Sequence, residues 1–131
     1  MLLKWITLRV PPAHRAGFAT AQDGWRALAS VPGFRWQVAG WAVDDPDRFG
    51  ALALWESRPA YDAFMAGPHD GLAAGQVGLY RDVESRLVEV GDAIACPNVE
   101  RLRLSGWPLL PASVPRPELM LEPRWRVFGK A

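Results

Sequence analysis

The sequence predicts an α+β fold of the ferredoxin-like type, with elements in the order β-α-β-β-α-β. Four segments are rich in β-branched and aromatic residues, as strands are. Two other segments carry apolar residues at helical spacing. One lies between the first and second strands, and the other lies between the third and fourth. This order is that of the split β-α-β motif, whose helices cover one face of an antiparallel sheet. The strand-like segments are 2–10, 34–43, 49–56 and 79–90.

Segment 2–10 begins the fold as a strand whose side chains alternate between the two faces of the sheet. Lys4 shares its face with Leu2, Ile6 and Leu8, and Trp5 lies on the opposite face. Two prolines end this strand. Segment 13–30 then has apolar residues spaced as in an amphipathic helix, and the following Val-Pro-Gly ends it.

Segments 34–43 and 49–56 are separated by a polar turn and predict a hairpin. Strict alternation places Trp36 on one face of its strand, and Arg35, Gln37 and Trp41 on the other.

Ser57 is a suitable N-cap for a second helix, since its hydroxyl can accept a bond from a free backbone amide. Phe64 lies in the apolar stripe of this helix. Gly67-Pro68 interrupts it, and residues 69–78 have room for a further turn or two before the last strand.

Composition limits the classes of protein. The 131 residues have the length of one domain, and 50% of them are hydrophobic, as in globular proteins. No apolar run reaches the length of a membrane span, and the first residues do not resemble a signal peptide. Cys96 is the only cysteine, which excludes an internal disulfide and a cysteine-based zinc site. We therefore expect a cytoplasmic protein.

The charge balance changes near residue 91. Residues 1–100 carry nine Lys or Arg against twelve Asp or Glu, whereas residues 101–131 carry six against two. We therefore expect a body at 1–90 and a Pro-rich, basic extension at 91–131 that packs on the body or on a dimer partner. Short strands are expected near 99–104 and 124–128. The extension has aromatic residues, Trp107 among them, but no dense basic run, so nucleic-acid binding is not favoured.

An antiparallel sheet with helices on one face leaves its other face uncovered. Trp5 and its neighbours make that face apolar. An uncovered apolar face predicts a homodimer in which two sheets pack face to face.

The chain resembles the antibiotic biosynthesis monooxygenase-like superfamily of dimeric α+β barrels, nearest an uncharacterised bacterial branch. The residues that carry this resemblance lie within 1–90. They are Met1-Leu-Leu-Lys-Trp-Ile6, Val31-Pro-Gly-Phe34, Gly40-Trp41, Leu54-Trp-Glu-Ser57, Tyr61-Asp-Ala-Phe-Met65 and His69-Asp70. The superfamily contains cofactor-free oxygenases, haem-degrading enzymes, isomerases and members without known activity, and fold does not choose among them.

The haem-degrading branch implies an asparagine on the first strand, a tryptophan in the second helix and a ligating histidine further along. These positions hold Ile6, Phe64 and Ala74 here, and His69 is five residues short of the ligand position. The residue pattern does not support haem, so no cofactor is expected. No metal site is expected either, because the two histidines lack metal-binding spacing.

His69 and Lys4 are the candidate catalytic residues. An imidazole next to a carboxylate, here Asp70, can act as a general base, and a lysine in an apolar strand can stabilise an anion. Residues 67–70 also resemble a helix start in which Asp70 caps the backbone. Aromatic and polar side chains at strand and helix positions would line a pocket for a flat ligand. These are Trp36, Trp55, Phe64, Arg35 and Gln37.

Two functions remain open. The first is a small-molecule-binding enzyme, a cofactor-independent monooxygenase or isomerase that acts on a flat hydrophobic compound. The second is a non-catalytic dimeric ligand-binding or stress-response module. A deep pocket that contains His69 favours the first, and a filled interior with His69 exposed favours the second.

Overall fold

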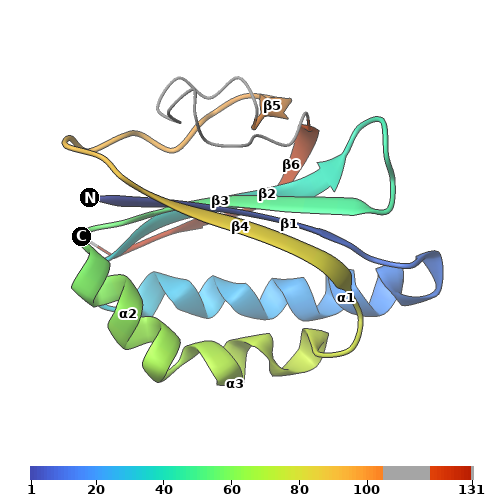
Figure 1. Ribbon diagram of the computed structural model, residues 1–131, viewed down its shortest axis with the longest axis horizontal. Helices are drawn as coiled ribbons and strands as arrows, with labels where there is room; N and C mark the ends of the chain where they lie inside the picture. The colour runs from blue at the N-terminus through green and yellow to red at the C-terminus, as the bar shows by residue number, and fades with distance from the viewer. Residues whose placement is uncertain (105–118, 131) are drawn as a thin grey trace.

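A computed structural model describes residues 1–104 and 119–130 (Figure 1). One antiparallel sheet has the strand order β4-β1-β3-β2-β6-β5, and the helices lie on one of its faces. The α+β, ferredoxin-like fold is therefore confirmed. The strands are β1 (Leu2–Arg9), β2 (Phe34–Ala42), β3 (Arg48–Trp55), β4 (Arg81–Glu89), β5 (Leu102–Arg103) and β6 (Met120–Phe128). The α-helices are α1 (Arg15–Gln22), α2 (Arg58–Ala66) and α3 (His69–Ala73), and the 3-10 helices are η1 (Pro12–His14), η2 (Asp23–Ser30) and η3 (Ala74–Gln76).

The helical layer is built from shorter pieces than the sequence predicts. The helix expected at 13–30 divides into η1, α1 and η2. At the start of α2 the Ser57 hydroxyl accepts a bond from the Ala60 backbone amide at 3.2 Å, which confirms the N-cap. Gly33 turns the chain into β2 with φ of +81°, and a Cβ there would also overlap the side chain of Ala60. Glycine is the residue that tolerates both conditions.

An irregularity in β2 changes which face its first residues occupy. Phe34 pairs with Trp55 and Trp36 pairs with Leu54, so Arg35 is an extra residue in the ladder. Phe34 consequently packs on the helix side, whereas Trp36 packs on the opposite side. The prediction that Trp36 and Trp41 lie on opposite faces is confirmed, with Trp41 on the helix side.

The second face of the sheet is covered by the same chain. Figure 1 shows β5 and the segment before it lying over the face opposite the helices. Leu102, Leu104 and Leu119 are buried there against Trp5, which is 1% exposed. Trp36 Nε1 donates a hydrogen bond to the Ile94 carbonyl at 2.7 Å. The uncovered apolar face from which a face-to-face dimer was predicted is thus covered within one chain, and the homodimer itself stays a prediction.

The described part of the extension contains both strands expected there. β6 pairs with β2 from Trp36 to Ala42, and β5 pairs with the start of β6. The division into 1–90 and 91–131 stays a prediction, although β6 belongs to the same sheet as the body. Trp107 lies outside the described residues.

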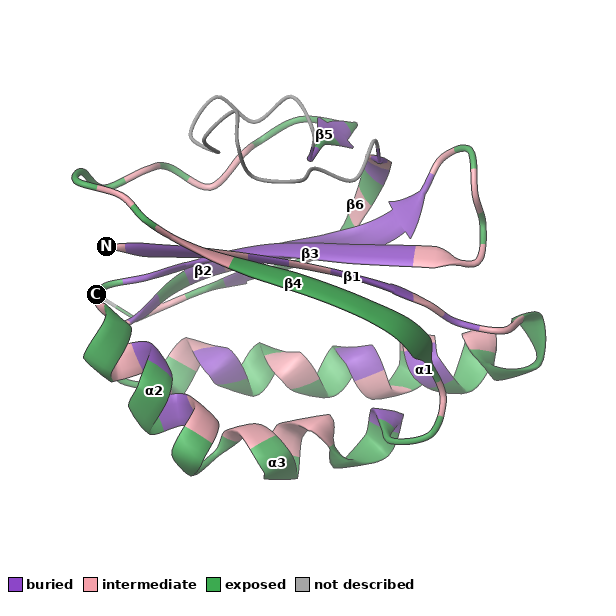
Figure 2. Cartoon of the chain, viewed as in Figure 1, coloured by how far each residue is buried: buried purple, intermediate pink, exposed green. Residues whose placement is uncertain are grey.

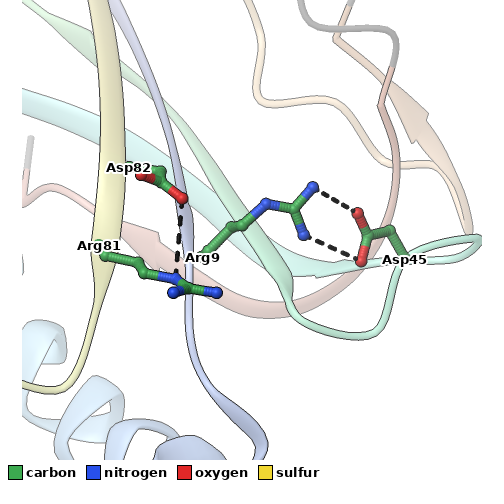
Figure 3. A network of polar contacts seen from close by, with 4 residues as sticks. All are labelled: Arg9, Asp45, Arg81 and Asp82. Carbon is green, nitrogen blue, oxygen red and sulfur yellow. Dashed lines mark hydrogen bonds and ion pairs between the residues drawn. The ribbon is translucent and has the colours of Figure 1, made fainter.

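Two ion pairs lie at the end of the sheet where β1 ends and β4 begins (Figure 3). The Arg9 guanidinium meets the Asp45 carboxylate at 3.1 Å, which ties the end of β1 to the turn between β2 and β3. Nearby, Arg81 lies 3.7 Å from Asp82, a residue with φ of +55° at the start of β4. The side chains of both pairs are accessible to solvent, so each pair contributes little to the free energy of unfolding. Their main effect is to orient the ends of the strands.

Within the described residues, no helix is long and apolar enough to cross a lipid bilayer.

Candidate functional site

A cavity of about 110 Å³ lies between the sheet and the helical layer. The side chains of β3 that form its floor explain why space remains between the sheet and the helices. On the helix side of β3 the residues alternate as Phe49, Ala51, Ala53 and Trp55, so two methyl groups lie between two large rings. The short alanines leave a hollow in the centre, and the rings close its ends. For scale, an engineered apolar cavity of about 150 Å³ binds benzene.

A polar row crosses the floor of the cavity. Ala53 pairs with Lys4 of β1 on one side and with Gln37 of β2 on the other, and all three line the cavity. Since neighbouring strands lie about 4.8 Å apart, the two polar side chains start about 10 Å from each other. The Lys4 ammonium lies 5.0 Å from the centre of the Tyr61 ring. The row therefore offers one cation and one amide to a ligand above Ala53.

His69 lies on the opposite, helical wall. Its ring lies between two aromatic rings, with centroids 5.9 Å from Trp25 and 5.7 Å from Phe64. Its Nδ1 lies 3.1 Å from Asp70 Oδ1, and its side chain is 26% exposed. An N–H at Nδ1 donated to this carboxylate leaves Nε2 as the basic nitrogen. Asp70 therefore contacts the imidazole, and it makes no N-cap, because no side chain caps α3.

Two buried glutamines and a tryptophan form a second polar group of the helical wall. Trp25 Nε1 donates to Gln76 Oε1 at 2.9 Å. Gln76 Nε2 in turn donates to Gln22 Oε1 at 2.7 Å and to the Phe18 carbonyl at 3.3 Å. Gln22 and Gln76 are 4% and 5% exposed and both line the cavity. The Gln22 oxygen accepts this bond, and the amide nitrogen of the same side chain adds a hydrogen-bond donor to the cavity wall.

The structure brings most of the sequence-predicted site residues together. Lys4, His69, Trp55, Phe64 and Gln37 all line the cavity.

The predicted pocket residues Trp36 and Arg35 do not line the cavity, which corrects the expectation for both. Trp36 lies on the face of the sheet opposite Gln37, as strict alternation places it, and it packs there with Trp5. It therefore could not share a pocket with Gln37. Arg35 is exposed and lies 3.6 Å from Glu56. As the extra residue in β2, Arg35 does not share the cavity face with Gln37, and strict alternation cannot locate such a bulge.

Gln22 and Gln76 are the site residues that sequence reasoning missed. Gln22 follows Phe18 by four residues and precedes Trp25 by three, so it lies on the buried stripe. A polar residue in an apolar stripe was the available signal. Gln76 has no such signal, because it lies in a short 3-10 turn between two glycine-containing segments.

No group of three or more His, Cys, Asp or Glu side chains in the described parts of the chain is close enough to hold a metal ion.

Comparison with known families assigns most of the chain. The sequence model of the family described as Domain of unknown function (DUF4937) matches residues 2–88. This chain belongs to the DUF4937 family. The match ends one residue before the end of β4, so the DUF4937 region contains the cavity but not β5 and β6.

One curated relative extends beyond that region. The uncharacterized protein YdbC of Bacillus subtilis is 29% identical over 130 residues, which span 98% of each chain. The similarity of this DUF4937 protein to YdbC therefore includes the extension.

Solved structures share the fold. A protein of Deinococcus radiodurans assigned as an antibiotic biosynthesis monooxygenase superposes with a TM-score of 0.64 at 19% identity, over 75% of this chain and all of that one. The cofactor-independent oxygenase SnoaB of Streptomyces nogalater superposes with a TM-score of 0.60 at 21% identity, over 71% of this chain and 95% of that one. MhuD of Mycobacterium tuberculosis, a haem degrader with two haems in its active site, gives 0.56 at 21% identity, over 72% and 100%. These similarities confirm the monooxygenase-like fold, and at such identities they show the fold alone.

Proposed function

We propose that this DUF4937 protein binds a small, flat, largely hydrophobic compound in the cavity and acts on it as a cofactor-independent monooxygenase or isomerase. The observation that carries the proposal is the convergence of Lys4, Gln37 and His69 on one aromatic cavity. A pocket with apolar walls and a few fixed polar groups is typical of a small-molecule site. A cavity that contains His69 favours the enzyme over the non-catalytic module.

The polar groups suit a ligand that loses a proton. His69, with Nδ1 facing Asp70, would accept the proton at Nε2. The resulting enolate or phenolate oxygen would be stabilised by the Lys4 ammonium from the floor. The amides of Gln22 and Gln37 would orient the other polar substituents of the ring. Removal of a proton is the step that isomerisation and direct reaction with oxygen share.

The size of the cavity supports the absence of haem from this site. At about 110 Å³ the space is of the order that one aromatic ring needs, whereas a porphyrin has four pyrrole rings. The positions that correspond to the haem-degrading pattern hold Ile6, Phe64 and Ala74. The residues present therefore do not fit a haem, and no step is assigned to one.

A cavity-filling variant tests whether ligands bind here. Ala53→Leu would fill the hollow between Lys4 and Gln37, whereas Ala63→Leu adds the same atoms on the exposed side of α2. We expect one-ring phenols to raise the melting temperature of the wild type and of Ala63→Leu but not of Ala53→Leu. Native mass spectrometry of the freshly purified proteins would show a bound compound in the wild type and in Ala63→Leu but not in Ala53→Leu. Binding that survives in Ala53→Leu would contradict the site.

Variants of the two charged groups separate binding from chemistry. Lys4→Met removes the cation, and we expect it to weaken binding of a phenolate about tenfold. His69→Ala removes the proton acceptor, and we expect turnover of a responsive phenol to fall about 100-fold or more with little change in binding. Oxygen consumption and product analysis measure turnover. Full turnover by His69→Ala would overturn its role as the base, and binding without turnover by the wild type would favour the non-catalytic module.

A further inference from the structure

The outer edge of β4 is the largest unpaired backbone edge in the described parts of the chain. β4 is the first strand in the sheet order, and β1 pairs with its inner side only. Figure 2 shows it exposed along most of its length, whereas β3 is buried. Val83 is 49% exposed on it. An exposed edge strand of nine residues offers a ready site for pairing with another strand.

The ladder with β1 shows which backbone groups face outward. The Val90 amide donates to the Met1 carbonyl at 2.8 Å, and the Met1 amine donates back to Val90 at 2.7 Å. Hydrogen-bonded pairs alternate along an antiparallel ladder, and the register is constant from Glu89 to Glu84. The N–H and C=O groups of Ser85 and Leu87 therefore point away from β1.

The sequence of β4 is self-complementary about Ser85. Antiparallel pairing of two copies in the register that places Ser85 opposite Ser85 also places Glu84 opposite Arg86 and Val83 opposite Leu87. The outward N–H and C=O groups of Ser85 meet those of Ser85 in the second copy in the same register, as a hydrogen-bonded pair requires. Moving the centre by one residue would instead place Glu84 opposite Glu84 or Arg86 opposite Arg86.

We propose that a second copy of this chain pairs with β4 through residues 83–87, edge to edge and centred on Ser85. The ladder stops before Asp82, because the positive φ of that residue and the register shift beside it bend the strand. Two sheets join into one across a two-fold axis. This arrangement differs from face-to-face packing, since the second face of each sheet is covered by its own chain.

A cysteine at the two-fold axis tests the register directly. In a hydrogen-bonded antiparallel pair the Cα atoms lie about 5.5 Å apart, within the range that a disulfide spans. We expect Ser85→Cys, in a Cys96→Ser background, to form a covalent dimer under mild oxidation. Val83→Cys in the same background is the matched control, because its two copies would lie about 13 Å apart. Equal cross-linking of both variants, or of neither, would overturn the register.

A charge exchange tests the side-chain pairing. Glu84→Arg places like charges opposite each other in two symmetric pairs, and we expect it to raise the dissociation constant of the dimer about tenfold or more. The double variant Glu84→Arg with Arg86→Glu restores opposite charges and is expected to restore the dimer. Sedimentation equilibrium measures all three proteins. Failure of the double variant to recover would contradict the pairing.

A proline tests the backbone contribution. Ser85→Pro removes an outward N–H without removing a bond to β1, and Ser85→Ala keeps that N–H. We expect the first to be monomeric and the second to dimerise as the wild type does. A wild-type protein that is monomeric at high micromolar concentration, or a dimer that Ser85→Pro and Glu84→Arg both leave intact, would overturn the proposal.

Discussion

Cys96 is a partly buried thiol whose reactivity the structure constrains. Burial raises its pKa above the ordinary value because the thiolate loses solvation, and the positive charge of Arg126 lowers it by a smaller amount. The folded chain therefore holds this proton more tightly than the unfolded chain does. Its small contribution to stability is present below the unfolded-state pKa and is lost as the pH rises towards the folded-state pKa.

We expect alkylation of Cys96 to be slow at neutral pH. Its rate should rise only at pH values above those at which a free cysteine thiol ionises. Iodoacetamide kinetics across pH measure this, with the chain unfolded in guanidinium as the reference. Arg126→Gln removes the charge that favours the thiolate, so it is expected to shift the rate profile further upward in pH. A native thiol that reacts as fast as the unfolded one would show that burial does not protect it.

At the scale of residues, sequence reasoning succeeds where alternation is regular. Lys4 and Trp5 lie on the faces that β1 predicts for them. It fails at Phe34 and Arg35, because one extra residue at the start of β2 shifts the alternation and no residue type marks the position. His69 was found by its chemistry, whereas Gln22 and Gln76 were not, since glutamine has no distinctive chemistry of its own.

At the scale of elements, one partly buried hydrogen bond joins the start of the extension to the sheet. Trp36 Nε1 donates to the Ile94 carbonyl beneath the segment that precedes β5. Trp36→Phe removes the donor and leaves that carbonyl without its partner, so we expect a loss of about 1–2 kcal/mol in the free energy of unfolding. We also expect faster proteolysis within residues 91–101.

Trp125→Phe is the control for that variant. Its Nε1 donates to Asp23 at an exposed position, where water can replace the bond. Chemical denaturation and limited proteolysis compare the two proteins. If both substitutions have the same small effect, the bond to Ile94 does not hold the extension.

The elements themselves were largely predictable. The spacing of apolar residues distinguishes strands from helices, and proline, glycine and capping residues mark where they begin and end. The four strands of the body and the cap at Ser57 are confirmed within a residue or two. The division of the first helix into η1, α1 and η2 was not predictable, since apolar residues at i and i+3 lie on one face of a 3-10 helix as well as of an α-helix. The path of the extension was open, because pairing partners of β6 depend on contacts distant in sequence.

At the scale of the whole molecule, the extension covers the apolar face of the sheet that a partner sheet was expected to cover. It adds β6 to the sheet beside β2 and covers the second face with leucines. The three solved structures compared above align over their full or nearly full length with about three quarters of this chain. About a quarter of this chain lies outside each of these alignments, whereas YdbC matches it over 98% of both chains.

Removal of residues 91–131 tests whether the body is independent of this addition. The shortened chain would expose Trp5, Trp36 and the apolar side chains around them, a patch that a monomer rarely leaves in water. We expect it to bind the dye ANS strongly and to form larger assemblies than the full chain, with a lower melting temperature. Size-exclusion chromatography with light scattering measures the association of both proteins. A shortened chain that keeps the association state of the full chain and melts at the same temperature would establish residues 1–90 as a separate domain and would show that the extension is not needed to cover the sheet.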